Sequence, residues 1–342
     1  CTADTAGLLK IRNTVGISLR EGFHEWAKMG ITAFVAHDWR SYTGLSPYAT
    51  RKDSADAFSC LATHQENRLW GGAELYKRQG KVLTYQAVGQ LCLLGANMGD
   101  FEVNGQLNTR FIIGKKPVML QAGGFIKNLH PDYFLEHYYS NHFYWNNQFQ
   151  NEYRTRLYGT LEIPSLGCNV SLQVENLSNY VFFNEQAVPD QWNGQLQVIS
   201  FSWNQHIAAG ILNWDNNLVY QASSQEAVLP LPAFSVYSNL YLKGSLSQVL
   251  LTQVGIDCRY HTSYYAPAYM PATGQFYVQQ AIRIGNYPFM NFYANFRLKQ
   301  ARFFIQYAHL SRLFATPVYF SAPHYPMNPA VLKVGISWNF YD

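Results

Sequence analysis

Apolar and polar residues alternate along most of this chain, and the final segment, VLKVGISWNFYD, shows the pattern most clearly. In an extended strand, successive side chains point to opposite faces. One face of this strand would carry Leu332, Val334, Ile336, Trp338 and Phe340. The other would carry Lys333, Gly335, Ser337, Asn339 and Tyr341. A soluble sheet would turn the apolar face to a core, whereas an outer-membrane barrel would turn it to lipid.

The same alternation recurs in VLTYQAVGQLCLLG, EVNGQLNTRFII, LLTQVGIDCRY and FYANFRL. The polar faces of these segments carry amides and charges, which a packed core would not accommodate. We therefore expect an all-β fold, an antiparallel transmembrane β-barrel with about 14 to 16 strands. The predicted strands span residues 8–21, 26–39, 67–77, 81–94, 101–113, 117–129, 147–162, 168–182, 194–205, 210–222, 233–244, 249–263, 290–299, 301–311 and 331–341. Within 194–205 the apolar positions change face after Val198, which indicates either a β-bulge or a different register.

The composition agrees with a membrane protein that crosses by strands. Charged residues are only 13% of the chain, against about 25% in a typical soluble domain. No run reaches the roughly 18 apolar residues of a transmembrane helix. The net charge of +4 is not gathered into a basic segment, so no nucleic-acid partner is expected. The five cysteines are widely spaced and predict neither a disulfide framework nor a zinc site.

Connections between the predicted strands alternate in length. GKKP, SLGCN and LKQA are short, whereas residues 40–66, 130–146, 264–289 and 312–330 form long connections. Short periplasmic turns and long extracellular loops are typical of outer-membrane barrels. Bacterial single-chain barrels have an even number of strands. The odd strand number therefore predicts that residues 1–342 form a single barrel domain that lacks an N-terminal portion.

The last third of the chain contains distinctive sequence segments, including YHTSYYAPAYMPATGQFYVQ and YFSAPHYPMNPAVLKVGISWNFYD. It resembles the C-terminal part of the "putative porin" family of Bacteroidetes-type outer membranes, over residues 249–342. The resemblance implies a longer barrel in the bacterial outer membrane, in contact with its lipid. The final strand also looks like the signal read by the barrel assembly machinery, although Asp342 follows the last aromatic residue.

The two faces of the predicted strands have different expected roles. The polar face would line a pore, where opposed charges select among solutes, or would contact an inserted plug. The predicted pore-lining residues are Thr84, Gln86, Gln90, Asn104, Gln106, Asn108, Arg110, Gln253, Asp257, Arg259, Asn295, Arg297, Arg302, Gln306, Lys333 and Ser337. The predicted lipid-facing residues are Leu83, Leu91, Leu107, Phe111, Phe296, Leu332, Val334, Ile336, Trp338 and Phe340.

Other chemistries have weaker sequence support. The segment HPDYFLEHYYSNH contains His130, Asp132, Glu136, His137 and His142, but without a recognised metal-site spacing. The pairs His261 with Ser263 and His309 with Ser311, expected on strands, would each need a carboxylate to orient the histidine for hydrolysis. We therefore expect no catalytic site, metal or cofactor. The predicted function is passive diffusion of small hydrophilic solutes; the alternatives are a closed or plugged barrel in an outer-membrane assembly and an outer-membrane hydrolase.

Overall fold

A computed structural model describes residues 4–45, 61–315 and 319–340 of the chain. Cys1 and Cys60 lie outside these ranges. Fifteen strands form one antiparallel sheet in chain order. They are β1 (Gly7–Leu19), β2 (Gly30–Leu45), β3 (Leu61–Lys77), β4 (Leu83–Gly95), β5 (Phe101–Ile113), β6 (Lys116–Leu129), β9 (Glu152–Ile163), β10 (Cys168–Phe183), β11 (Pro189–Ala209), β12 (Leu212–Ser223), β13 (Phe234–Leu246), β14 (Leu250–His261), β17 (Phe289–Leu298), β18 (Ala301–Ala308) and β21 (Val331–Trp338).

Short elements lie in the long connections. Between β6 and β9 are α1 (Tyr133–Glu136), β7 (His137–Tyr139) and β8 (Tyr144–Asn146). The β14–β17 connection contains β15 (Ala268–Met270) and β16 (Gln275–Tyr277). The helical turn η2 (Pro164–Leu166) joins β9 to β10, and η3 (Leu310–Leu313), β19 (Phe320–Ala322) and β20 (Tyr325–Pro326) follow β18. Across the described part of the chain, no helix is long and apolar enough to cross a membrane.

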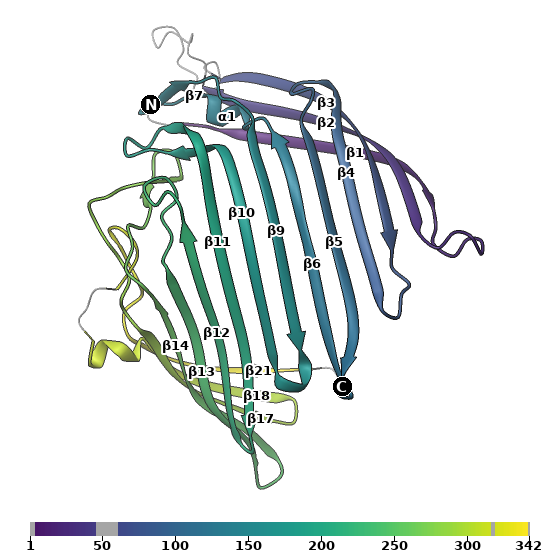
Figure 1. Cartoon of the computed structure of the whole chain (residues 1–342). Helices are drawn as coiled ribbons and strands as arrows, with labels where there is room; N and C mark the ends of the chain where they lie inside the picture. The colour runs from purple at the N-terminus through teal and green to yellow at the C-terminus, as the bar shows by residue number, and fades with distance from the viewer. Residues whose placement is uncertain (1–3, 46–60, 316–318, 341–342) are drawn as a thin grey trace.

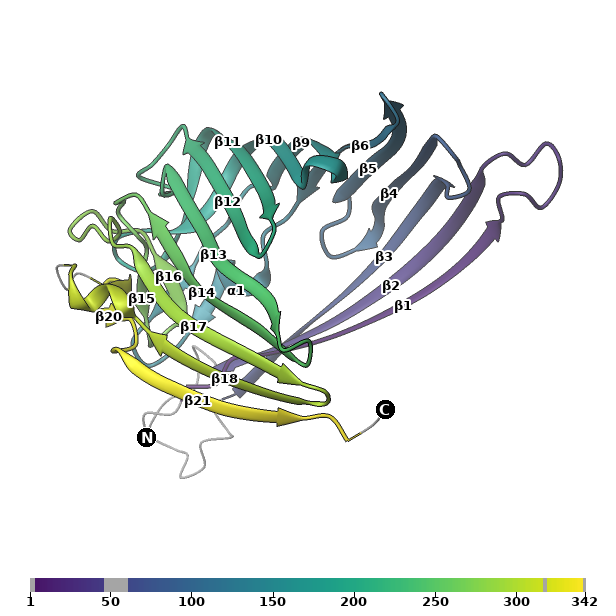
Figure 2. The same cartoon turned by 90° about the horizontal axis from the view of Figure 1, so that it is seen from below.

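The sheet curves strongly, so that it encloses a space on one side (Figures 1 and 2). Its edges are β1 and β21, and each long strand pairs only with its neighbours in chain order. Long and short connections mostly alternate as expected, apart from short ones at residues 96–100 and 184–188 on the long side and a longer one at residues 20–29 on the short side. The predicted strand order and the antiparallel arrangement are confirmed.

The register explains the irregular pattern around Val198. Residues 195–205 of β11 pair continuously with β10, and the bulge lies further along, at Ser178 and Tyr180 of β10. Leu196 is buried against Leu177 and Val228, and Val198 packs on the same cluster. The alternative of a β-bulge at the change of face is therefore wrong. Leu196 and Val198 are apolar residues of the inner face that fill a cluster there, whereas Ile199 and the alternate residues after it lie on the outer face.

Candidate functional site: the inner face of the sheet

Strand pairing places all the predicted pore-lining residues on one face of the sheet. Residues that pair directly across antiparallel strands share a face. In β4 and β5, Gln86 pairs with Gln106. On the other side of the sheet, Gln306 pairs with Lys333. Continuous pairing through the intervening strands links the two groups.

The charged side chains of the long strands are confined to this face more completely than the sequence predicted. Nearly every Asp, Glu, Lys and Arg of the long strands lies on this face. The exceptions are Lys77 and Lys116, which stand at strand ends. Asp190 lies beyond the register shift in the β10–β11 pairing. Burying a charge in hydrocarbon is costly, so this division identifies the opposite face as the one suited to lipid.

The charged face is the concave one. In Figure 2, α1 lies within the curve of the sheet. The ring of Tyr42 in β2 packs against Tyr133 and Phe134 of α1, with centroid distances of 4.9 and 5.3 Å. Because Tyr42 and Arg40 are on the same face as Asp38, the charged side chains point into the enclosed space.

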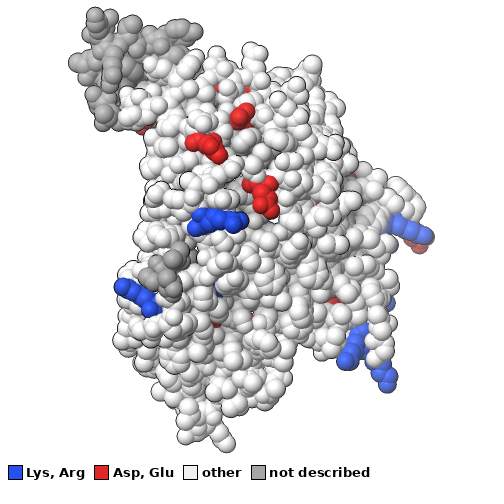
Figure 3. All heavy atoms as spheres, turned by 60° about the vertical axis from the view of Figure 1, so that its left-hand side comes forward, with Lys and Arg blue, Asp and Glu red and all other residues white. Residues whose placement is uncertain are grey.

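The predicted lipid-facing residues lie on the convex face. The cross-strand pairs Phe296 with Phe303 and Val334 with Ile305 join apolar side chains there. Exposure is high for many of them, at 67% for Val334 and 69% for Ile336. Phe340 is also exposed but follows the end of β21. Figure 3 shows the outer surface of part of the sheet, where wide areas carry no charged side chain.

Most charges on β1 to β10 form ion pairs across the inner wall. Glu175 accepts hydrogen bonds from the guanidinium groups of Arg154 and Arg156. Lys127 Nζ lies 2.6 Å from Glu102 Oε1. Further ion pairs join Arg12 to Asp38, Arg68 to Glu66 and Arg78 to Glu74. These residues were missed as pore-lining candidates, although segments such as EYRTRLYG carry the same alternation.

On β13 to β21 the inner wall is cationic instead. Within the described residues, none of Lys243, Arg259, Arg297, Arg302 and Lys333 forms an ion pair. The carboxylate on this part of the wall is Asp257, which accepts a hydrogen bond from Asn291. The inner wall therefore has an ion-paired half and a half with excess positive charge.

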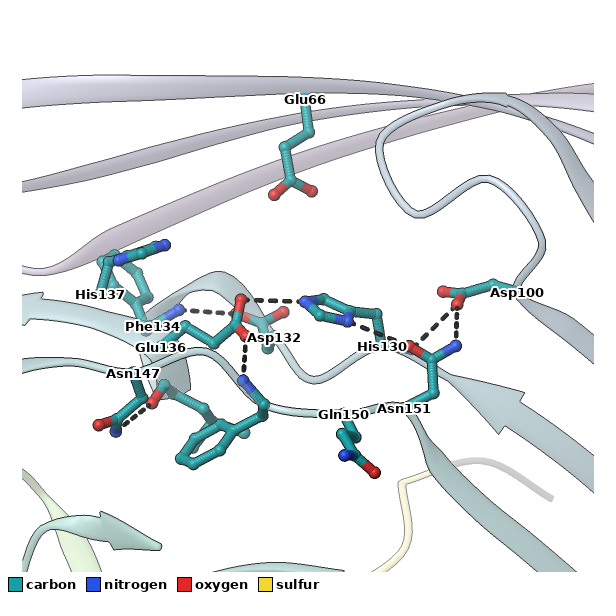
Figure 4. Close-up of polar contacts among 12 residues, drawn as sticks. Glu66, Asp100, His130, Asp132, Phe134, Glu136, His137, Asn147, Gln150 and Asn151 are labelled. Carbon is teal, nitrogen blue, oxygen red and sulfur yellow. Dashed lines mark hydrogen bonds and ion pairs between the residues drawn. The ribbon is translucent and has the colours of Figure 1, made fainter. Parts of the chain in front are cut away.

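The segment between β6 and β9 folds onto the ion-paired half (Figure 4). Asp132 caps α1 by accepting from the Phe134 N–H, and its other oxygen lies 3.6 Å from Arg40 Nη1. Glu136 accepts from the Phe149 N–H and lies 3.0 Å from His130 Nε2. The Arg40 contact fixes the segment to the inner face of β2, and the stacking of Tyr133 on His64, with ring centroids 4.2 Å apart, fixes it to β3.

Asp100, in the turn between β4 and β5, anchors the start of this segment. Its Oδ1 accepts from the His130 N–H at 3.0 Å and from Asn151 Nδ2 at 3.1 Å. Its Oδ2 is buried and has no hydrogen-bond partner among the described residues. Burial raises the pKa of the Asp100 carboxyl above its ordinary value, and these hydrogen bonds oppose the rise.

The histidine-rich segment is organised by protein contacts. Asp132 forms an ion pair with Arg40, and His137 Nδ1 lies 2.7 Å from Asn146 Oδ1. In the described ranges no three His, Cys, Asp or Glu side chains are grouped to hold a metal.

Of the two His and Ser pairs, His261 alone lies on a strand as expected, as the last residue of β14. Ser263 follows the end of β14, and Ser311 lies in η3. His309 contacts Tyr287, and Ser311 Oγ accepts from the Met290 N–H. No hydrogen bond joins the histidine and serine side chains of either pair within the structure described.

Comparison with known proteins decides what kind of sheet this is. The model of a family described as "Putative porin" matches residues 1–342, the whole chain. The chain belongs to this porin family. A comparison with curated proteins gave no match.

Solved outer-membrane receptors share the fold of this porin-family chain. The ferric enterobactin receptor PfeA of Pseudomonas aeruginosa is 15% identical, with a TM-score of 0.60, and the match covers 90% of this chain and 49% of PfeA. The siderophore receptor PirA of Acinetobacter baumannii is 10% identical (TM-score 0.61; coverage 98% and 55%). The copper transporter OprC is 13% identical (TM-score 0.62; coverage 89% and 51%). The chain spans about half the length of these proteins.

Family and fold together place the protein in the bacterial outer membrane. The sheet belongs to a transmembrane β-barrel, and its convex apolar face is the one suited to lipid. The predicted fold class and location are thus confirmed.

Proposed function

We propose that the barrel is a porin through which small hydrophilic solutes diffuse passively. The observation that carries the proposal is the placement of nearly all strand charges on the concave face. A water-filled lumen hydrates these side chains, whereas a dry interior would leave the unpaired ones unsatisfied.

The polar residues of the concave face line this pore in the proposal. They include the predicted set from Thr84 to Ser337, together with the ion-paired residues of β1 to β10. Selection follows from pore size and from inward charges. The inward segment at residues 130–151 narrows the lumen on the ion-paired side, and no catalytic step is required.

The excess of unpaired cations gives the pore a preference for anions. On the inner face, Arg110 and the cations of β13 to β21 have no carboxylate partner among the described residues. Of the carboxylates on that face, Glu152, Glu162 and Asp257 lack an ion pair. Cations thus exceed anions once mutual pairs are removed, and a solute passing them meets a positive potential.

Further strands complete the barrel in this proposal. Backbone groups at the outer edges of β1 and β21 have no strand partner in the described sheet. Unpaired backbone groups in lipid cost several kcal/mol each. Because the fifteen strands alternate in direction, β1 and β21 run parallel. An odd number of additional strands would close the sheet with antiparallel pairs throughout, which fits the predicted N-terminal portion.

The edge strand β21 is the proposed contact with the barrel assembly machinery. It combines a free strand edge with exposed Val334, Ile336 and Trp338. An exposed edge is a template for pairing with another strand. Deleting residues 331–342 from the full-length protein should abolish its insertion into outer membranes, measured by fractionation, and unimpaired insertion would contradict this role.

The test is single-channel recording in a planar bilayer, with the full-length protein extracted from outer membranes. Discrete ohmic steps, with a reversal potential in a KCl gradient that indicates chloride preference, are expected. A folded, heat-modifiable protein that conducts nothing would contradict the porin proposal and favour a plugged barrel in an outer-membrane assembly.

A further inference from the structure

A cavity of about 590 Å³ lies on the cationic half of the inner wall, bounded by β13, β14 and the two long connections after them. Its wall includes Ser235, Tyr237 and Arg259, which share the concave face because Arg259 pairs with Tyr237. The volume lies in the range of sites for small molecules, about 300–1,000 Å³.

Arg259 supplies a positive charge that the protein leaves available. It is exposed, and its guanidinium carbon lies 5.8 Å from the centre of the Tyr237 ring. No carboxylate pairs with it in the part of the chain that the structure describes. An arginine held beside an aromatic ring can still direct its N–H groups to a ligand carboxylate.

Another part of the cavity lining is aromatic and firmly held. It includes Tyr287, Phe289 and Tyr319. All three rings contact His309, which has no exposed surface. The centroid of His309 lies 4.6 Å from both Phe289 and Tyr319. A buried histidine therefore fixes the positions of these rings.

His309 is itself held by several hydrogen bonds. Its Nδ1 lies 2.9 Å from the Asn328 carbonyl oxygen, which can only accept, so Nδ1 carries a proton. In the neutral ring, Nε2 then accepts from the Tyr287 hydroxyl at 2.7 Å. The backbone N–H of His309 donates to Asn291 Oδ1.

The backbone of His309 is in an unfavourable conformation. Its φ of 62° and ψ of 46° are left-handed, a region that non-glycine residues seldom occupy. Such residues persist where the surroundings fix them, and they gather at binding sites. The strain is thus concentrated at the residue that arranges the aromatic wall.

Polar groups complete the cavity. Asn217 and Ser235 come from the strands, and Ser321 and Asn328 from the last long connection. Amides and hydroxyls can bond to sugar hydroxyl groups, and aromatic rings can pack on the apolar faces of sugars. A ligand that uses all these features needs a ring, several hydroxyl groups and one negative charge.

We propose that this cavity binds a sugar acid of the hexuronate class, with its carboxylate on Arg259 and its ring against Phe289 and Tyr319. The proposal names a solute class for the pore and rests on the proposed water-filled lumen. Binding here would concentrate the solute on the cationic wall before it passes.

The test uses the full-length protein and D-glucuronate as the probe, with D-glucose and acetate for comparison. Binding is measured by calorimetry in detergent, and blockade by the fluctuation of single-channel current. We expect glucuronate to bind at least about tenfold more tightly than either comparison compound, because it alone offers both the ring and the charge. Equal affinity for acetate and glucuronate would overturn the proposal.

Variants separate the two parts of the cavity. Arg259→Gln should lower the glucuronate affinity at least about tenfold, to that of glucose. Tyr319→Leu should weaken both sugars and leave acetate unchanged. Arg297→Gln is the matched control, since it removes another inner-wall arginine outside the cavity and should leave glucuronate binding intact. Unchanged glucuronate affinity in Arg259→Gln would refute the site.

Failure of this inference is distinct from failure of the porin proposal. Conductance without binding of glucuronate would overturn the cavity assignment alone. Binding detected by calorimetry in a protein that does not conduct would support the cavity and overturn the porin proposal.

Discussion

Asp132 Oδ2 lies 3.6 Å from Arg40 Nη1, so an ion pair joins the segment within the curve of the sheet to strand β2 of its wall. The same carboxylate oxygen accepts from the Tyr42 hydroxyl at 3.2 Å. Two residues separated widely in sequence thereby hold the segment against the inner face. This contact has a direct consequence for the width of the lumen.

Asp132→Asn should loosen the inward segment without unfolding α1. Asparagine caps a helix about as well as aspartate, so the Phe134 N–H keeps its acceptor. The charge attraction to Arg40 is lost, at a cost of about 0.5–1 kcal/mol because Asp132 is partly exposed. Single-channel currents should become larger and noisier.

Recording the Asp132→Asn variant at two ionic strengths is the control. High ionic strength screens a partly exposed ion pair. The difference in current noise between the wild type and Asp132→Asn should therefore shrink at 1 M KCl. Indistinguishable recordings at low salt would show that the pair does not restrain the segment.

Val334→Arg and Ser337→Arg test the two faces of β21. Val334 lies on the convex face and is 67% exposed, whereas Ser337 pairs with Arg302 on the concave face. An arginine facing lipid near the bilayer midplane costs about 2–4 kcal/mol. Val334→Arg should thus reduce the free energy of unfolding in lipid vesicles and impair assembly, while Ser337→Arg should change conduction alone. Similar losses in both variants would show that the faces are wrongly assigned.

Charge reversal on the cationic wall should change ion preference. Arg302 and Lys333 lie on adjacent strands and face the lumen in the proposal. Replacing both with glutamate changes the local charge by four units, from two positive to two negative. The reversal potential in a KCl gradient should move toward that of potassium. The double variant Arg302→Gln and Lys333→Gln should give an intermediate value, and no shift in either would place these residues away from the conduction path.

Asp100 should make stability fall as pH rises. Its folded-state pKa is raised by burial, so the folded protein binds a proton more readily than the unfolded chain. The contribution of Asp100 is therefore most favourable below the ordinary aspartate pKa of about 3.9 and is lost as pH rises through the raised value. Asp100→Asn keeps an acceptor for the His130 N–H but cannot titrate.

Urea unfolding in vesicles between pH 3.5 and 8 measures this effect. The stability of wild type relative to Asp100→Asn should increase as pH falls through the raised pKa. A constant difference between the two proteins over this range would contradict the assigned cause.

The alternation of residues was sufficient to predict the strands and the chemistry of their faces. In VLKVGISWNFYD and EVNGQLNTRFII, the side-chain period of two separates Val334 from Lys333 and Phe111 from Arg110. This local property holds for any strand, so the antiparallel order and the common face of the polar residues could be inferred without coordinates. The odd strand number was also readable from the spacing of the turns.

Only the tertiary structure decided which charges meet and which stay free. Glu175 lies between Arg154 and Arg156 because β9 and β10 pair in a particular register, while Arg259 lines a cavity with Tyr287 and Tyr319 from connections distant in sequence. The positions of Leu196 and His309 likewise depend on segments that fold back onto the sheet. Alternation reports which face a side chain occupies, but the register and the path of the loops determine its neighbours, and these depend on contacts between residues far apart in the chain.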